Sequence, residues 1–174
     1  MKKIICVLAV AVMLLSLLSG CNMLWDVAGS TAKTYSTDDL TLELPANMMD
    51  LKGDDFEEYD MVYANDKFGI FLLKEPREDF ADYDPDLDVQ GYAELMTEAS
   101  REVSDAEPVL SRSAAGNPVI TYEATVDGET FSYYTVLLGN DEAFFSLQFY
   151  CGKDKFEELL ADFETYEATI TLKE

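Results

Sequence analysis

Two turn signals divide the most apolar stretch of the chain into three segments. Asp127-Gly128 separates residues 119–126 from residues 131–138, and Gly139-Asn140 separates the latter from residues 143–150. An Asp-Gly pair between two apolar runs is typical of a type I′ hairpin turn, in which both central residues adopt a positive φ. The spacing therefore predicts a three-stranded antiparallel meander, around which the rest of the chain must pack.

Both faces of this meander are apolar. Neighbouring residues in a strand point to opposite faces, so each of the aromatic pairs Tyr133-Tyr134, Phe144-Phe145 and Phe149-Tyr150 places one ring on each side. A sheet of this kind requires cover on both faces, which favours a core over an open aromatic groove for a peptide or glycan. Cys151 shares the face of Phe149 and is expected to be a core residue rather than a reactive thiol, because the chain has no histidine to activate it.

Alternating and helical periodicities predict the other elements. Strands are expected at residues 40–45, around 59–64 and at 68–73, with Asn65-Asp66 as a turn. Asp88 is expected to cap a helix whose apolar face comprises Tyr92, Leu95, Met96, Ala99 and Val103.

A second helix is expected near the end of the chain. Asp154 and Glu157 form a capping-box-like pair before an apolar face of Phe156, Leu159, Leu160 and Phe163, and residues 168–172 suit a final short strand. The order is β-β-β-α-β-β-β-α-β, with one extra short strand allowed at 109–111. The sequence thus predicts an α+β fold with a largely antiparallel β-sheet and two main amphipathic helices packed on it.

A short apolar run near the start of the chain ends in a cysteine. Lys2 and Lys3 precede residues 4–18, which are all apolar except Ser16, a run that suits a signal-peptide core and is short for the roughly 30 Å of a membrane interior. Leu18-Ser19-Gly20-Cys21 then matches the lipobox of bacterial lipoproteins, because the small pair fits a narrow protease site and the cysteine thiol accepts lipid. The alternative is an ordinary secretory signal that ends in cysteine.

The lipobox predicts cleavage between Gly20 and Cys21 and a diacylglycerol on the Cys21 thiol, with room for an N-acyl chain. The chain then divides into a lipoprotein signal peptide at 1–20, a lipidated tether at 21–36 and a single α+β domain at 37–174. Such a protein would be held at the extracytoplasmic face of the cell membrane.

Composition excludes several kinds of chemistry. The net charge is −23, so nucleic-acid phosphates would be repelled and nucleic acid is not an expected partner. With no histidine, the chain cannot form Ser-His-Asp or Cys-His catalytic groups or histidine-ligated zinc. After cleavage and lipidation Cys151 is the only free cysteine, so no intramolecular disulfide is expected.

An acidic loop provides the one candidate metal site. Asp82, Asp84, Asp86 and Asp88 alternate with other residues, and clustered carboxylates can bind Ca²⁺. The spacing is not that of an EF-hand, and an extended chain would spread these carboxylates rather than converge them. A solvated acidic loop is the favoured interpretation, with Ca²⁺ binding as the alternative.

The element order resembles that of a PsbP-like domain, an αβα sandwich. The features that carry the resemblance are an opening strand that ends in Leu44-Pro45, a helix around 92–103, the meander around Asp127-Gly128 and a closing helix at 156–163. The resemblance spans residues 37–174 and implies a binding or assembly factor rather than an enzyme. It transfers no functional residue, since no position matches a family site motif.

These observations favour a non-enzymatic, lipid-anchored, extracytoplasmic binding or assembly module without a bound cofactor, whose partner is an unidentified protein or envelope ligand. One alternative is a Ca²⁺-binding envelope protein that uses the acidic loop. Another is a histidine-free hydrolase that uses a pair of carboxylates as acid and base.

Overall fold

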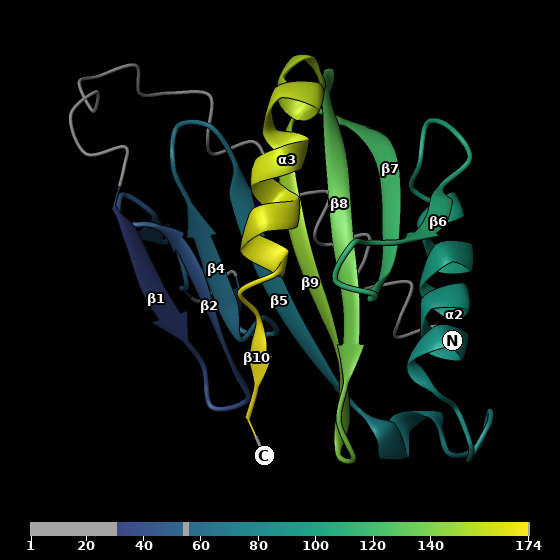
Figure 1. Cartoon of the computed structure of the whole chain (residues 1–174). Coiled ribbons are helices and arrows are strands. Elements are labelled where there is room, and N and C mark those ends of the chain that lie inside the picture. The colour runs from purple at the N-terminus through teal and green to yellow at the C-terminus, as the bar shows by residue number, and fades with distance from the viewer. Residues whose placement is uncertain (1–30, 54–55, 174) are drawn as a thin grey trace.

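The computed structural model describes residues 31–53 and 56–173, which form two antiparallel sheets and two main helices (Figure 1). The larger sheet has seven strands in the spatial order β3 (Met49–Asp50), β4 (Met61–Ala64), β5 (Gly69–Pro76), β9 (Ala143–Gly152), β8 (Glu129–Gly139), β7 (Pro118–Val126) and β6 (Val109–Arg112). The smaller sheet consists of β1 (Ala32–Ser36), β2 (Leu40–Pro45) and β10 (Thr171–Leu172), with β2 in the centre.

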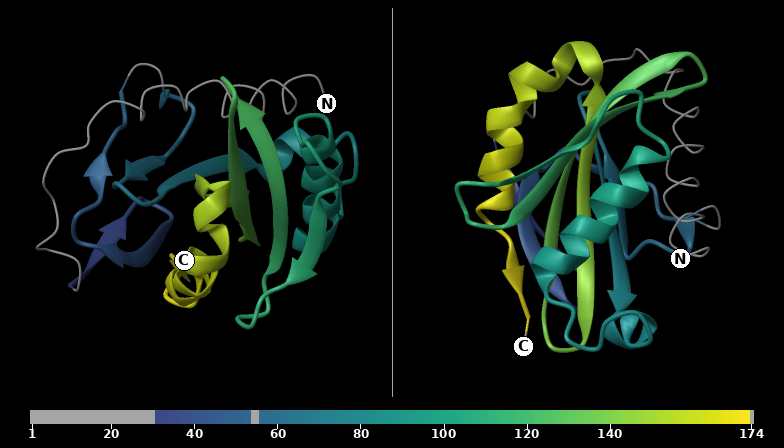
Figure 2. Two further views of the ribbon diagram at one scale, coloured as in Figure 1. Left: turned by 90° about the horizontal axis from the view of Figure 1, so that it is seen from above. Right: turned by 90° about the vertical axis from the view of Figure 1, so that its right-hand side faces the viewer.

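The two helices cover opposite faces of the larger sheet (Figure 2). Helix α2 (Val89–Arg101) contacts β6, β7 and β8 on one face, whereas α3 (Phe156–Glu167) contacts β8 and β9 on the other and also touches β2 of the smaller sheet. Two hydrophobic cores result, one centred on Tyr92 and Phe144 under α2 and one on Phe149 and Phe163 under α3. The α+β class and the pair of sheet-packed helices are therefore confirmed.

The meander is present, and its first turn is as expected. Asp127 and Gly128 have φ values of 52° and 86°, as a type I′ turn requires. The second turn differs, because Gly139 belongs to β8 and lies in register with Phe144. Asn140 forms the turn instead: its side-chain oxygen accepts hydrogen bonds from the main-chain N–H groups of Glu142 and Ala143.

The expected alternation of side chains between the two faces of the meander is also confirmed. Tyr133, Phe144 and Tyr150 belong to the core under α2, whereas Tyr134, Phe145, Phe149 and Cys151 belong to the core under α3. Each of these side chains is less than a tenth exposed. In the described part of the chain, this double burial makes the meander the structural centre of the domain rather than an open aromatic groove.

The ordered domain begins earlier than residue 37. Strand β1 lies within the range 21–36 that was expected to be a tether, and it pairs along its whole length with β2. Tyr35 holds it in place, because its ring is buried and packs edge-on against Tyr63 at 4.8 Å between centroids. Only one of the five β1 residues is buried, so the strand has almost no hydrophobic periodicity to reveal it.

The predicted N-cap is correct for helix α2 and wrong for helix α3. Asp88 caps α2, and its carboxylate accepts a hydrogen bond of 2.7 Å from the N–H of Gly91. The capping box at Asp154 is wrong, because residues 153–155 form the 3-10 turn η4 (Lys153–Lys155) and Lys155 at the N-cap makes no side-chain cap. Ala168 is the C-cap of α3 and a turn follows it, so the last strand starts at Thr171.

One glycine is required by a close approach. An added Cβ at Gly69 in β5 would lie 2.2 Å from the ring of Tyr150 in β9, the residue with which Gly69 is in register. The tyrosine ring therefore lies flat across the neighbouring strand, as aromatic side chains do over glycine in sheets. No helix formed by residues 31–53 or 56–173 is long and apolar enough to cross a membrane.

Candidate functional site

The acidic loop is turned rather than extended. Asp82, Asp84, Asp86 and Asp88 are all exposed, the Asp84 carboxylate accepts a hydrogen bond from the N–H of Asp86, and Asp88 is committed to the cap of α2. Within the described ranges, no three acidic or cysteine side chains lie close enough together to hold a metal ion. Ca²⁺ binding by this loop therefore stays a hypothesis, which isothermal titration with Ca²⁺ tests.

Arg77 fixes the acidic loop to the end of the meander. It lies in the 3-10 turn η3 (Arg77–Phe80), and its guanidinium donates to the carbonyl of Leu87 at 2.7 Å and to that of Asn140 at 2.6 Å. The same group lies 4.1 Å from the ring centre of Phe144, within range for a cation–π contact. The start of α2 and the β8–β9 turn are thus held side by side.

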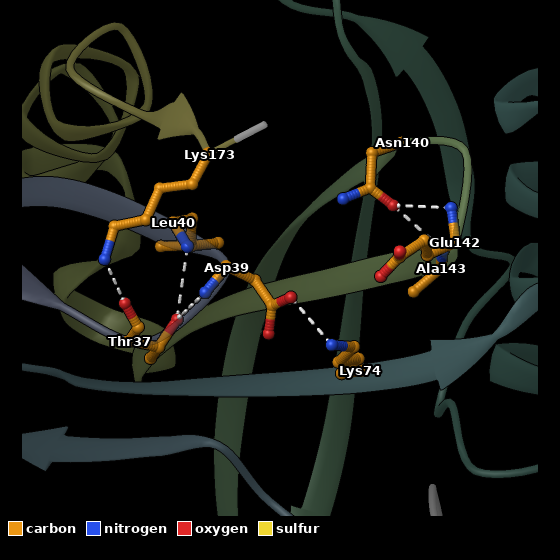
Figure 3. Close-up of polar contacts among 8 residues, drawn as sticks. All are labelled: Thr37, Asp39, Leu40, Lys74, Asn140, Glu142, Ala143 and Lys173. Carbon is orange, nitrogen blue, oxygen red and sulfur yellow. Dashed lines mark hydrogen bonds and ion pairs between the residues drawn. The ribbon is translucent and has the colours of Figure 1, made fainter.

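A polar junction connects the two sheets at the same end of the molecule (Figure 3). The Lys74 ammonium of β5 donates to the Asp39 carboxylate at 2.7 Å, and this hydrogen bond raises the pKa of Lys74. Lys173 reaches the carbonyl of Thr37, and its N–H donates to the carbonyl of Asp39 at 2.7 Å. Because Lys74 and Asp39 keep a partly exposed ion pair, the junction is a surface contact that contributes modestly to stability.

One carboxyl at this end is half-buried. Glu75 accepts a hydrogen bond of 2.6 Å from the hydroxyl of Tyr92, which is fully buried in α2. Burial raises the pKa of Glu75, while the Tyr92 hydrogen bond offsets part of that rise. An acid with a raised pKa can act as a proton donor, but the hydrogen bond from Tyr92 makes Glu75 a structural contact between β5 and α2. The carboxylate-hydrolase alternative stays a hypothesis, testable by screening glycan and peptide substrates.

Cys151 lies at the end of β9 and is only 2% exposed. Burial raises the pKa of its thiol to about 11, with a smaller contribution from the nearby Asp154 carboxylate. A thiol with this pKa is almost entirely protonated at neutral pH and is a poor nucleophile. The expected core role of Cys151 is therefore confirmed.

A buried carboxylate was missed in the sequence. Glu167, the last residue of α3, is 2% exposed and accepts hydrogen bonds from Tyr134 at 2.5 Å, Asn117 at 2.9 Å and the hydroxyl of Ser113. These donors lie 33 to 54 residues away in the sequence. The Glu167 network, formed by these four residues, fixes the β6–β7 loop (residues 113–117) to α3 across the sheet edge.

Beside this loop lies an open depression of about 450 Å³, called here the edge groove. It lies between the start of α2, the β6–β7 loop and the last residues of β8, with Leu172 of β10 at its far side. Arg112 lies on its rim and donates hydrogen bonds of 2.9 Å to the carbonyl of Gly116 and to the side chain of Gln90. The depression thus lies beside the end of β8, where Leu137 and Leu138 are buried, and carries a fixed cation on its rim.

Sequence reasoning could not have located this groove. Its lining comes from four separate segments, and apolar residues there such as Leu137 look like ordinary core positions. Two smaller depressions of about 200 Å³ lie elsewhere, one between the start of β1 and the end of α3 and one between the β4–β5 turn and the end of β9.

Comparison with known proteins supports the fold and leaves the function open. No family model matches the chain, and no curated protein is similar to it in sequence. The solution structure of cyanobacterial PsbP (CyanoP) from Synechocystis sp. PCC 6803 matches with a TM-score of 0.52 at 13% identity, covering 89% of this chain and 99% of that one. LpqN of Mycobacterium tuberculosis, described as involved in cell envelope biogenesis, gives a TM-score of 0.49 at 11% identity, covering 83% and 91%.

The fold is therefore PsbP-like, as the element order suggested. Helices pack on antiparallel sheets in the same arrangement as in the cyanobacterial protein, over nearly the whole of that structure. At 13% identity the likeness concerns the fold alone. Function must be argued from this chain's own residues.

Proposed function

We propose that this protein is a non-enzymatic binding or assembly module, held at the extracytoplasmic face of a bacterial membrane by lipid on Cys21. The observation that carries the proposal is the sequence Leu18-Ser19-Gly20-Cys21 at the end of an apolar run. These residues lie outside the described part of the chain, so the anchor rests on sequence chemistry. One acyl chain holds a protein weakly at about 0.8 kcal/mol per buried CH₂, and the two chains of a diacylglycerol hold it firmly.

The described domain supports a binding role. Both faces of its large sheet are covered by packed elements, so the surfaces left for a partner are strand edges, loops and rim depressions. Its one thiol is buried and protonated, and the chain has no histidine. A neighbour of similar fold, LpqN, is described as acting in envelope biogenesis, which is compatible with such a role.

Replacement of the lipidated cysteine tests the anchor. Cells that express the full chain are labelled with an alkyne fatty acid and fractionated. The wild-type protein should carry label and remain with membranes, whereas Cys21→Ser should lose the label and remain uncleaved or be released. Cys6→Ser, which removes the thiol inside the expected signal peptide, is the matched control and should behave as wild type. A Cys21→Ser protein that is still labelled and still cleaved after Gly20 would refute the anchor.

A further inference from the structure

Strand β6 forms one edge of the larger sheet and has a neighbour on one side only. It pairs with β7 from Val109 to Arg112, and no other described strand adjoins it (Figure 1). An unpaired strand edge leaves main-chain N–H and C=O groups free to pair with another chain. The opposite edge strand, β3, has only two residues, so β6 provides the longer open edge of this sheet.

The register determines which main-chain groups point outward from β6. The N–H of Ser113 donates to the carbonyl of Asn117, and antiparallel strands repeat such hydrogen-bonded pairs at every second residue. Odd-numbered residues of β6 therefore bond to β7, while Leu110 and Arg112 direct N–H and C=O away from the sheet. No loop, helix or side chain among the described residues forms a hydrogen bond with these four groups. They remain available to a partner strand.

The side chains of β6 leave this edge accessible. Because neighbouring side chains alternate, Val109 and Ser111 point to the face opposite α2, and both are exposed, Val109 by 57%. Leu110 and Arg112 point to the α2 face, where Leu110 is half-buried against the core and Arg112 reaches Gln90. A partner strand beside β6 would therefore cover one of the few large apolar side chains exposed in the described part of the chain.

The charges along β6 make the strand complementary to itself. Arg112, at its end, forms no ion pair with any described residue, since its guanidinium donates only to a main-chain carbonyl and a glutamine side chain. The start of β6 is acidic, because Glu98 and Glu107 share a single cation there, Arg101. When two copies of such a strand pair antiparallel, the basic end of each meets the acidic end of the other.

We infer that two copies of this chain associate through β6, as antiparallel strands related by a two-fold axis. With Leu110 of each copy opposite Arg112 of the other, all four outward groups of both copies are hydrogen-bonded, and Ser111 faces its own counterpart. A pairing centred on Leu110 would instead place Arg112 opposite Pro108, which has no N–H to donate. A second copy as the partner goes beyond the proposed function and does not depend on the lipid anchor.

Helix α2 leaves room for this contact. It packs over β6, β7 and β8, so it lies inward from the open edge. In the paired sheet the β7 strands of the two copies are three strand spacings apart, about 14 Å. Packed helices need about 8–10 Å between their axes, so both α2 helices fit on the same face.

The same pairing brings opposite charges together at both ends of the contact. Arg112 of one copy lies three residues, roughly 10 Å, along the strand from Glu107 of the other, and both side chains shorten this distance. The loop 113–117, which passes beside that acidic end, has no charged residue. The net charge of −23 opposes association, and a four-residue strand pair is a small contact, so we expect a reversible dimer.

Disulfide cross-linking of the purified full chain in detergent tests the pairing. Cys6 and Cys21 are changed to serine, so the result does not depend on lipid, and Cys151 is buried with a pKa of about 11. Ser111→Cys should form disulfide-linked dimers on mild oxidation, because opposed residues of a non-hydrogen-bonded pair lie about 4.5 Å apart between Cα atoms. Val109→Cys is the matched control on the same face of the same strand. Its two copies lie four residues apart, roughly 13 Å, and should give about tenfold less dimer or lower.

A measurement on the unmodified chain keeps the test independent of introduced cysteines. As the protein concentration rises, amide exchange at Leu110 and Arg112 should slow by about tenfold or more, while Thr34 on the open strand β1 should not change. Ser111→Glu sets two carboxylates face to face and should abolish this effect, whereas Ser111→Thr should retain it. Equal cross-linking of the Ser111→Cys and Val109→Cys chains, or exchange at Leu110 that is independent of concentration, would overturn the inference.

Discussion

The Glu167 network offers a stringent test of the packing between α3 and the β6–β7 loop. Its carboxylate is buried and receives three neutral donors, from Ser113, Asn117 and Tyr134. Glu167→Gln keeps the shape but replaces one acceptor oxygen with an amide donor. At least one of the three donors then loses its acceptor or must rotate away.

The expected loss follows from the hydrogen bonds. A buried donor left without its acceptor costs about 1–3 kcal/mol, and two bonds that change from a charged to a neutral acceptor together weaken by about 1 kcal/mol. Removal of a negative charge at the C-terminus of a helix restores about 0.5 kcal/mol. The net expectation for Glu167→Gln is a loss of about 2 kcal/mol, or a Tm lower by about 4–8 °C in a domain of this size.

Thermal unfolding followed by near-ultraviolet circular dichroism measures this change on the full chain in detergent. The matched control is Glu164→Gln, which removes an exposed carboxylate from the same last turn of α3 and so has the same effect on the helix dipole. The difference between the two variants isolates the network. A Tm for Glu167→Gln within about 2 °C of the control would refute the reasoning.

Three further outcomes are expected. Gly69→Ala should lower the free energy of unfolding by about 2 kcal/mol or more, because its Cβ would overlap the ring of Tyr150, and urea denaturation measures this loss. Burial raises the pKa of Glu75 in the folded protein, so Glu75 binds its proton more tightly when the protein is folded. The stability that this protonation gives is present at pH 4 and is lost as the pH rises through the folded pKa. Glu75→Gln can still accept a hydrogen bond from Tyr92, so melting experiments should show a gain in stability relative to wild type between pH 4 and 7. Cys151, with a pKa of about 11 and 2% exposure, should react with a thiol reagent at pH 8 only after unfolding, and rapid labelling of the native protein would contradict its burial.

The elements that could be predicted are those whose signal is local. The Asp127-Gly128 turn, the facing of Tyr133 and Tyr134, and the cap at Asp88 each depend on residues within a few positions of one another. Such features follow from backbone sterics and from side-chain alternation, which operate in the same way in any fold. Enough of the elements carry such local signals to predict the order of helices and strands, and hence the PsbP-like arrangement.

Elements that depend on long-range contacts were missed or misplaced. Strand β1 is held by its pairing with β2 and by the contact of Tyr35 with Tyr63, and the β8–β9 turn is set by the side chain of Asn140 rather than by Gly139. Glu167 looks like any other acid on a helix until Tyr134 and its other donors are brought to it by the fold. The edge groove is of the same kind, since its lining comes from four segments that only the fold brings together.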